Sequence, residues 1–272
     1  GLLGPNGSGK TTLLNIIMNV TLPDSGCVKI FGKDVQRNTD LLEQINFVAG
    51  EARFHWALTA ENILNFYGMI YRLDKKKRER RIKTLAKELG VEYLLKRRFY
   101  MLSTGERMRV MLLRALINKP KIILMDEPTL GLDPSIAIQV RKQIKKLNRK
   151  FKTTILLTSH YMNEVEELAD RIAFINRGSI VDVGEVEKVK SRKFESYEVI
   201  ATLSKFRDTS FLKSRGFRIR GNKVSKFLAT DQNISDILST LEAKKFEIVN
   251  IETRKPTLED YFVKILKKGE KE

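Results

Sequence analysis

A glycine-rich stretch near the start of the chain has the composition and spacing of a phosphate-binding loop. Residues 4–11 read GPNGSGKT and fit the pattern G-x-x-x-x-G-K-[ST]. Glycines leave backbone N–H groups free to converge on phosphate oxygens, and a helix that begins directly afterwards points its positive end at the same anion. The residues expected to contact a nucleotide are Gly4, Pro5, Asn6, Gly7, Ser8, Gly9, Lys10, Thr11 and Thr12. The alternative is a glycine-rich turn that binds no ligand.

Two further residue pairs could complete a site for nucleotide hydrolysis. Lys10 would reach the β- and γ-phosphates, and the Thr11 hydroxyl would bind Mg²⁺. Asp126 and Glu127 end a long apolar stretch, where Asp126 could hold the metal and Glu127 could polarise a water for attack on the γ-phosphate. The alternative for this acidic pair is an exposed position before a proline.

A histidine and a serine turn offer additional contacts to phosphate. His160 follows another apolar stretch, and its imidazole could donate a hydrogen bond to a γ-phosphate oxygen or to the attacking water. Ser103 and Gly105 precede an expected helix, which makes a second anion site. Two such sites are useful if two copies of the chain pair head to tail and each completes the other's loop. His55 lacks comparable neighbours and is expected to be an ordinary loop residue.

The elements that must position these residues alternate between helix and strand. We expect helices over 12–17, 63–70, 75–89 and 163–169, one from the turn at 102–106 through 118, and one from the turn at 131–134 to about 150. We expect strands over 27–31, 45–48, 121–128, 154–159 and 171–176. Thr59 is expected to cap the helix that follows it, and Gly90 to end the basic helix before it. Continuously apolar strands indicate a mostly parallel sheet covered on both faces, with ligands at the strand ends.

The pattern changes near residue 189. Beyond it the expected strands are shorter and alternating, over 197–203, 217–220, 224–229 and 246–252, with helices over 234–243 and 258–267. The chain is therefore predicted to consist of a nucleotide-binding α/β domain, residues 1–189, and a small α+β accessory domain, residues 190–272. No clustered catalytic residues occur in the second domain.

Composition narrows the setting in which the protein works. The net charge is +18, from 51 Lys and Arg against 33 Asp and Glu, which fits either a nucleic-acid binder or a protein beside an anionic membrane leaflet. Cys27 is the only cysteine, so no intrachain disulfide can form. No apolar run approaches the roughly 20 residues that span a bilayer.

Only Gly1, Leu2 and Leu3 precede the loop, although such a loop normally follows a full strand, so we expect N-terminal strands to be missing from this sequence.

The ordered motifs GPNGSGKT, LSTGE, IILMDEP, GLD and TSH resemble the nucleotide-binding domain of an ABC transporter over residues 1 to about 185. The resemblance implies a P-loop NTPase fold with a helical subdomain at about 58–118, which binds ATP and Mg²⁺. It assigns Lys10 and Thr11 to Walker A, Ser103 and Gly105 to the signature, Asp126 to Walker B, Glu127 as the catalytic base, Asp133 to the D-loop and His160 as the switch histidine. The PTLEDYF stretch at 256–262 is similar to the C-terminal extension of ATPases that serve exporter-type permeases.

The chain departs from the family pattern in three places. The Q-loop glutamine would fall at Gly50, which has no side chain to reach Mg²⁺ or water, and the neighbouring Glu51 could replace it. The signature reads STGE rather than SGGQ, although Ser103 and Gly105 are retained. The aromatic residue that stacks on adenine lies upstream of residue 1 in this family and is missing here.

These features together predict the ATP-hydrolysing subunit of an ABC transporter, bound to the cytoplasmic face of the cell membrane. ATP would close a homodimer, and the closure would energise a separate permease, with export favoured over import. Residues 50–60 and the helix after them would contact that permease. One alternative is a soluble ABC ATPase that acts on ribosomes or nucleic acid. Such relatives usually carry two domains or a long coiled coil, so nucleic acid is the less favoured partner. The other alternative is an inactive fragment.

Overall fold

The structure is a computed structural model that describes residues 1–49, 54–193, 196–204, 209–229, 233–244, 246–254, 258 and 262. Its contacts divide the chain into two compact units, Gly1–Val183 and Gly184–Glu272. The boundary expected at residue 189 falls inside α7 (Val186–Lys193) of the second unit.

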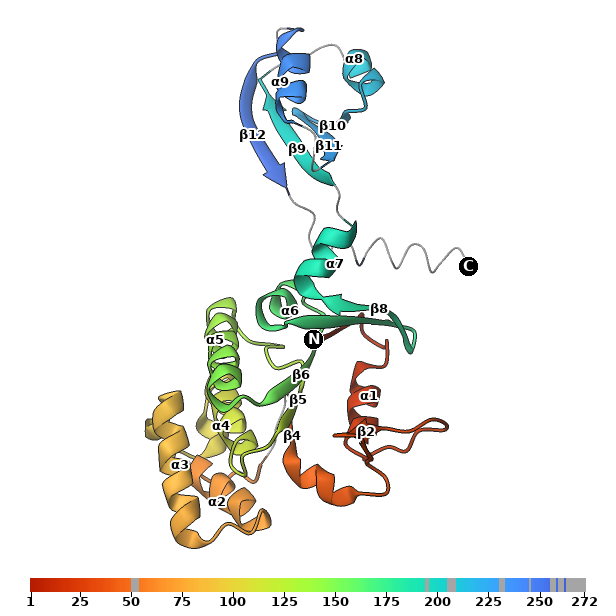
Figure 1. The fold of residues 1–272 in the computed structure, drawn as a ribbon. Helices are drawn as coiled ribbons and strands as arrows, with labels where there is room; N and C mark the ends of the chain where they lie inside the picture. The colour runs from red at the N-terminus through yellow and green to blue at the C-terminus, as the bar shows by residue number, and fades with distance from the viewer. Residues whose placement is uncertain are drawn as a thin grey trace. The chain divides into compact units, whose positions relative to one another are not determined.

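A six-stranded sheet forms the centre of the first unit, in the order β4-β5-β6-β1-β7-β8 (Figure 1). The strands are β1 (Leu2–Leu3), β4 (Ile45–Ala49), β5 (Ile122–Asp126), β6 (Thr154–Ser159), β7 (Arg171–Asn176) and β8 (Ser179–Glu185). Every pair from β4 to β7 is parallel, as the sequence predicts. The carboxyl ends of these strands therefore meet at one edge of the sheet, where α/β proteins bind their ligands.

The short strand β1 determines where the glycine-rich loop leaves the sheet. Leu3 is fully buried and lies in register with Ser159 of β6 and Phe174 of β7. The loop that starts at Gly4 consequently emerges beside the end of β6, next to the segment that carries His160.

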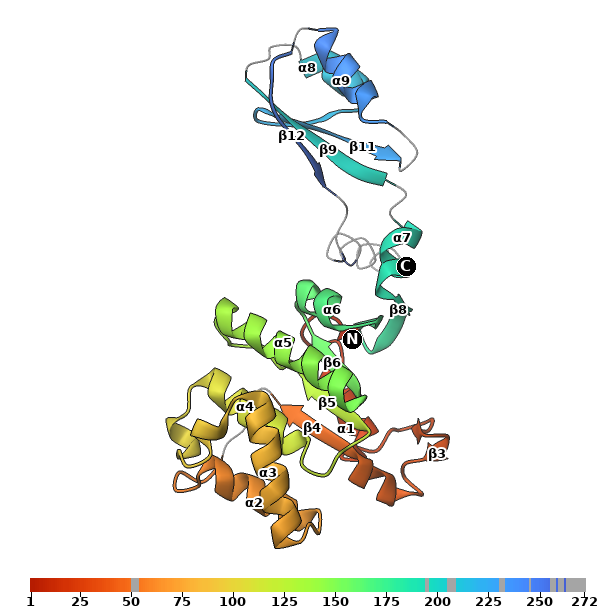
Figure 2. The same cartoon turned by 60° about the vertical axis from the view of Figure 1, so that its left-hand side comes forward.

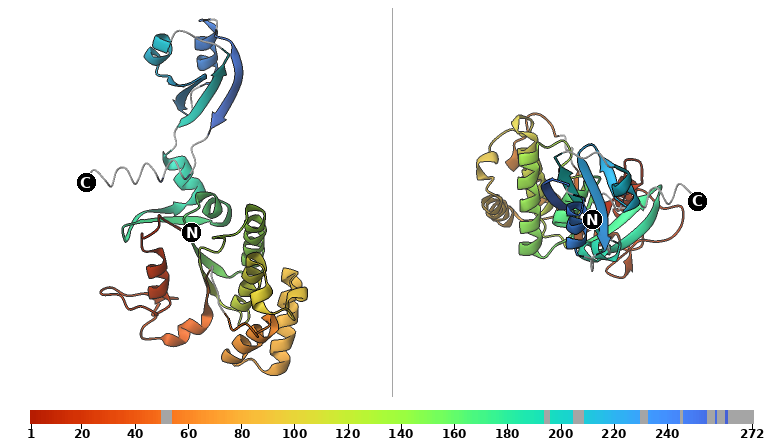
Figure 3. Two further views of the ribbon diagram at one scale, coloured as in Figure 1. Left: turned by 180° about the vertical axis from the view of Figure 1, so that it is seen from behind. Right: turned by 90° about the horizontal axis from the view of Figure 1, so that it is seen from above.

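Helices cover both faces of the sheet. α1 (Lys10–Ile17) packs on one face, where Leu14 lies in a buried cluster with Leu124 of β5 and Ile30 of β2 (Lys29–Ile30), which pairs with β3 (Lys33–Asp34). α4 (Thr104–Ala115) and α5 (Pro134–Phe151) lie on the other face, as views from the front and from behind both show (Figures 1 and 3). Because successive side chains of a strand point to opposite faces, β5 buries Leu124 toward α1 and Met125 toward the other layer.

Three helices, α2 (Ala60–Ile70), α3 (Lys75–Leu89) and α4, pack together as a helical region beside the sheet (Figure 2). The two predicted ends are confirmed: the Thr59 hydroxyl accepts a hydrogen bond from the Asn62 backbone, and Gly90 ends α3 with a φ of 64°. α4 ends at Ala115 rather than at Asn118 as expected. The next backbone N–H groups bond three residues back, which tightens the last turn and terminates the α-helix.

The second unit contains a four-stranded antiparallel sheet in the order β10-β11-β9-β12. Its elements are α7, β9 (Ser196–Leu203), α8 (Thr209–Ser214), β10 (Arg218–Arg220), β11 (Lys223–Ala229), α9 (Ser235–Glu242) and β12 (Ile248–Arg254). Val199 of β9, Leu212 of α8 and Leu241 of α9 belong to its buried core. The short helices α7 and α8 were not expected, because each carries too few apolar residues to show a helical period. The strand β8 was not expected either, because its apolar residues do not alternate strictly with polar ones. Most of the helix predicted over 258–267 lies outside the described residues.

Within the described part of the chain, no helix is both long enough and apolar enough to cross a bilayer.

Candidate active site

The glycine-rich loop has a backbone that side chains would disrupt. Gly7 and Gly9 have φ values of 77° and 103°, in the left-handed region that other residues adopt only with strain. A Cβ on Gly4 would lie 2.3 Å from the Ile175 carbonyl oxygen and 2.6 Å from Ser8 Oγ. The loop therefore depends on glycine both for its turns and for close packing against β7.

Two polar side chains in the loop are arranged for an anionic ligand. Lys10 is only 5% exposed, and its Nζ donates hydrogen bonds to the carbonyl oxygens of Gly4 (2.9 Å) and Pro5 (3.1 Å). Ser8 Oγ is buried and has no hydrogen-bond partner. A buried hydroxyl without a partner is unfavourable, and a phosphate oxygen in the loop would provide one. Gly9 caps the N-terminus of α1, whose positive end favours the same charge.

A hydroxyl and a carboxylate meet beside the loop. Thr11 Oγ1 donates a hydrogen bond to Asp126 Oδ2 (2.8 Å), and Thr158 Oγ1 donates one to Asp126 Oδ1 (2.5 Å). The described residues contain no cluster of three or more acidic, His or Cys side chains that could hold a metal alone. Mg²⁺ in nucleotide sites is usually held by one or two carboxylates together with substrate phosphates. The donor set around Asp126 therefore fits Mg²⁺ that is shared with a nucleotide.

The Glu127 carboxylate lies between the Lys10 ammonium group and the His160 imidazole. Its Oε1 is 3.5 Å from Lys10 Nζ, and its Oε2 is 2.9 Å from His160 Nδ1, a contact without the alignment of a hydrogen bond. Glu127 has a φ of 47°, which costs about 1–2 kcal/mol for a residue with a Cβ. Its backbone N–H is held by the Thr158 carbonyl oxygen (3.2 Å) and hydroxyl (3.1 Å). The end of β6 thus supports the strained backbone that presents this carboxylate.

Three other predicted residues, Ser103, Gly105 and Asp133, lie in other parts of the chain. Ser103 caps α4 in a capping box with Glu106, and a Cβ on Gly105 would lie 2.4 Å from Ile136 Cγ2 of α5. Asp133 is exposed and caps α5 without a side-chain hydrogen bond. α4 lies across the sheet from α1 in both views (Figures 1 and 2). A single chain therefore does not bring Ser103 or Gly105 to its own loop.

The predictions for Gly50 and Glu51 concern residues outside the part of the chain that the structure describes.

Two polar neighbours of the site were not predicted from the sequence. The contact of Thr158 with Asp126 and Glu127 was not predicted, although its position near the end of an apolar strand indicated the correct edge of the sheet. Glu164, which is buried near His160, was also missed because no sequence pattern distinguishes it from the half-buried acids of α6 (Met162–Leu168).

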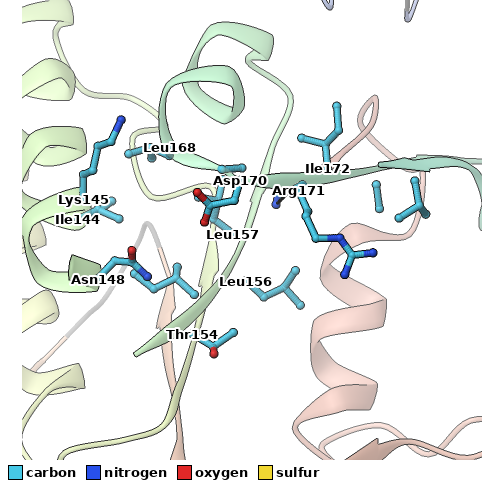
Figure 4. Close-up of a pocket in the computed structure, with 15 residues that line it drawn as sticks. Ile144, Lys145, Asn148, Thr154, Leu156, Leu157, Leu168, Asp170, Arg171 and Ile172 are labelled. Carbon is cyan, nitrogen blue, oxygen red and sulfur yellow. Dashed lines mark hydrogen bonds between the residues drawn. The ribbon is translucent and has the colours of Figure 1, made fainter. Parts of the chain in front are cut away.

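A hollow of about 430 Å³ lies beside β6 and β7, away from the loop (Figure 4). Its walls include Ile144 of α5, Leu156 of β6 and Ile172 of β7. Because β1 pairs only with Thr158 and Ser159 of β6, the earlier residues of β6 border the hollow instead. No residue of the glycine-rich loop lines it, so it is not the expected triphosphate site.

Comparisons with known proteins identify the family of this chain. The ABC transporter family profile matches residues 1–130. The chain is 33% identical to the uncharacterised ABC transporter ATP-binding protein sll0415 of Synechocystis, over 98% of this chain and 74% of the relative. It is 29% identical to the linearmycin resistance ATP-binding protein LnrL of Bacillus subtilis, over 97% of this chain and 88% of the relative. Among solved structures, cbiO1 of Clostridium perfringens, part of the ABC transporter complex cbiONQ, matches with a TM-score of 0.65 and 25% identity. That match covers 71% of this chain and 78% of cbiO1.

Proposed function

The chain belongs to the ABC transporter ATP-binding family, whose members are ATPases that bind ATP with Mg²⁺, and from this premise we propose that it energises a separate permease through ATP-driven closure of a homodimer. The observation that carries the proposal is the convergence of Lys10, Thr11, Asp126 and Glu127 at the carboxyl edge of the sheet. The cytoplasmic face of the cell membrane is the proposed location.

Each residue of this cluster has a proposed task in hydrolysis. Lys10 and the loop N–H groups bind the triphosphate, so ATP replaces the contact between Lys10 and Glu127 with one between Lys10 and phosphate. Thr11 and Asp126 would hold Mg²⁺, which supplies charge neutralisation on the phosphates. Glu127 accepts a proton from the attacking water. His160 orients the water or the γ-phosphate through a ring N–H.

The signature residues are proposed to complete the site of a second copy. Ser103 and Gly105 stand at the N-terminus of α4, where backbone N–H groups and the helix dipole favour an anion. They lie away from the loop of their own chain, so they are available to a partner. Asp133, at the N-terminus of α5, is also proposed to line the interface between the copies.

We expect Glu127→Gln to change from monomer to dimer when MgATP is added, because ATP that is not hydrolysed keeps the two copies together. Analytical ultracentrifugation of the variant with and without MgATP measures this change. Adding Lys10→Ala to the variant serves as the control and should abolish the dimer. A Glu127→Gln variant that binds MgATP and yet remains monomeric at saturation would contradict the closure mechanism.

An exposed apolar surface beside α2 is the proposed site of permease contact. This docking patch consists of Trp56, Leu58, Phe66, Met69 and Ile70, and all but Leu58 are more than half exposed. Phe66, Met69 and Ile70 share one face of α2, because residues three and four apart lie next to each other on a helix. Exposed apolar groups in such number mark an interaction surface.

Replacing Phe66 and Met69 together by Asp should remove the chain from its permease, since two charges would be buried in an apolar contact. The chain and the membrane protein encoded beside its gene are co-expressed, and the ATP-binding subunit retained on washed membranes is measured. We expect roughly a 10-fold loss of retention, within the range of interface hot spots. Val249→Asp, a change at an exposed apolar residue of the second unit, should have no effect. Unchanged retention of the double variant would exclude the patch.

Export is the proposed direction of transport. LnrL, which is named for resistance to linearmycin, is similar to this chain over both units rather than over the ATPase unit alone. The C-terminal unit is therefore proposed to be part of the same kind of transporter.

A further inference from the structure

A buried carboxylate that the proposed mechanism does not use lies behind the catalytic cluster. Glu164 of α6 is 2% exposed. Its Oε1 accepts a hydrogen bond from Thr129 Oγ1 (2.7 Å), and its Oε2 accepts one from Ser159 Oγ (2.7 Å). Both hydroxyls are themselves buried, so the three side chains form a small polar network inside the protein.

The two partners of Glu164 belong to the two segments that carry the proposed catalytic groups. Thr129 follows Glu127 by two residues, and Ser159 directly precedes His160. Ser159 Oγ also accepts a hydrogen bond from the Tyr161 backbone N–H (2.9 Å), so it fixes the chain on both sides of His160. One carboxylate therefore connects the loop after β5 to the turn after β6.

We propose that Glu164 is a positioning residue, which sets the distance between Glu127 and His160 by holding the segments that carry them. The inference rests on the proposed roles of these two residues in hydrolysis. The strained backbone of Glu127 needs such support, since a residue with a Cβ at a φ of 47° persists only when its surroundings hold it there. Thr158 holds that backbone from one side, and the Thr129–Glu164 hydrogen bond holds the loop two residues further on.

The Glu164 carboxyl is costly to bury, which indicates that it does more than fill space in the core. Burial raises the pKa of the Glu164 carboxyl, while the hydrogen bonds from Ser159 and Thr129 and the charge of Arg141 oppose that shift. An apolar side chain could fill the same space without this penalty but could not hold two hydroxyls in fixed directions.

The first test uses the nucleotide-free protein and does not depend on turnover. The chain contains only two histidines, so the imidazole NMR resonances of His160 and His55 can be followed separately. We expect Thr129→Val, which removes one hydroxyl at nearly constant volume, to move the His160 resonances as Glu164→Ala does. The His55 resonances should stay in place in both variants. His160 resonances that are unchanged in well-folded variants would overturn the proposal.

The second test separates positioning from folding by kinetics. Glu164→Ala should lower kcat for ATP by roughly 10- to 100-fold, the range for a misplaced catalytic group, and leave KM and MgATP affinity within about two-fold. Glu164→Gln keeps an acceptor for one hydroxyl and should recover most of kcat. Assays at a temperature where circular dichroism shows full folding exclude a stability effect. Equal kcat in the Ala variant and wild type would overturn the proposal. Hydrolysis that survives Glu127→Gln would instead contradict the proposed catalytic roles.

Discussion

Glu127→Gln should lower ATP hydrolysis on the order of 10²-fold or more while MgATP affinity is retained. The variant removes the carboxylate that is proposed to accept the proton of the attacking water. It leaves Lys10, Thr11 and Asp126 in place, and these are the groups proposed to hold the triphosphate and Mg²⁺. Single-turnover hydrolysis and equilibrium binding of a fluorescent ATP analogue measure the two effects separately.

The structure adds a second reason to expect retained affinity in this variant. Without nucleotide, Glu127 Oε1 lies 3.5 Å from Lys10 Nζ and competes with phosphate for the ammonium group. A neutral glutamine competes less, so affinity should stay equal or rise. Glu79→Gln, at an exposed carboxylate of α3, is the matched control for loss of one negative charge and should hydrolyse ATP at the wild-type rate. If Glu127→Gln hydrolyses as fast as that control, another group is the base.

The sequence predicted the central sheet because its strands are continuously apolar. β6 and β7 have the predicted bounds, and β5 lies within the predicted segment. Parallel neighbours place their carboxyl ends together, which is why Lys10, Asp126 and His160 could be expected at one edge. The helix α8 has too few apolar residues to show a helical period, and the apolar residues of β8 do not alternate strictly with polar ones, so both elements were found only in the structure.

The connections between catalytic segments were beyond sequence reasoning. Thr158 and Glu164 each have a hydrogen-bond partner far away in the sequence: Thr158 donates to Asp126, and Glu164 accepts from Thr129. No spacing rule indicates which polar side chains of a helix or strand are buried toward such a partner. For Gly105, the sequence motif identified the position but not the whole reason for the glycine. Its close approach to Ile136 of α5 is a packing reason, which adds to the proposed contact with phosphate.

A mixture of two inactive variants should recover hydrolysis if the composite site exists. Lys10→Ala removes the proposed phosphate contact of the loop. Ser103→Asp keeps a good N-cap for α4 but places a negative charge where the partner's phosphate would bind. In a mixed pair, the loop of the Ser103→Asp copy faces the intact signature of the Lys10→Ala copy, so one of the two sites is complete.

The recovered activity can be estimated from random pairing of the two copies. A two-fold homodimer forms the mixed pair about half of the time, and each mixed pair has one intact site, so we expect about a quarter of the wild-type rate. Each variant alone is the baseline, and thermal unfolding shows whether both fold. If the Lys10→Ala and Ser103→Asp mixture stays at the baseline although both variants fold, the signature of one copy does not complete the loop of the other.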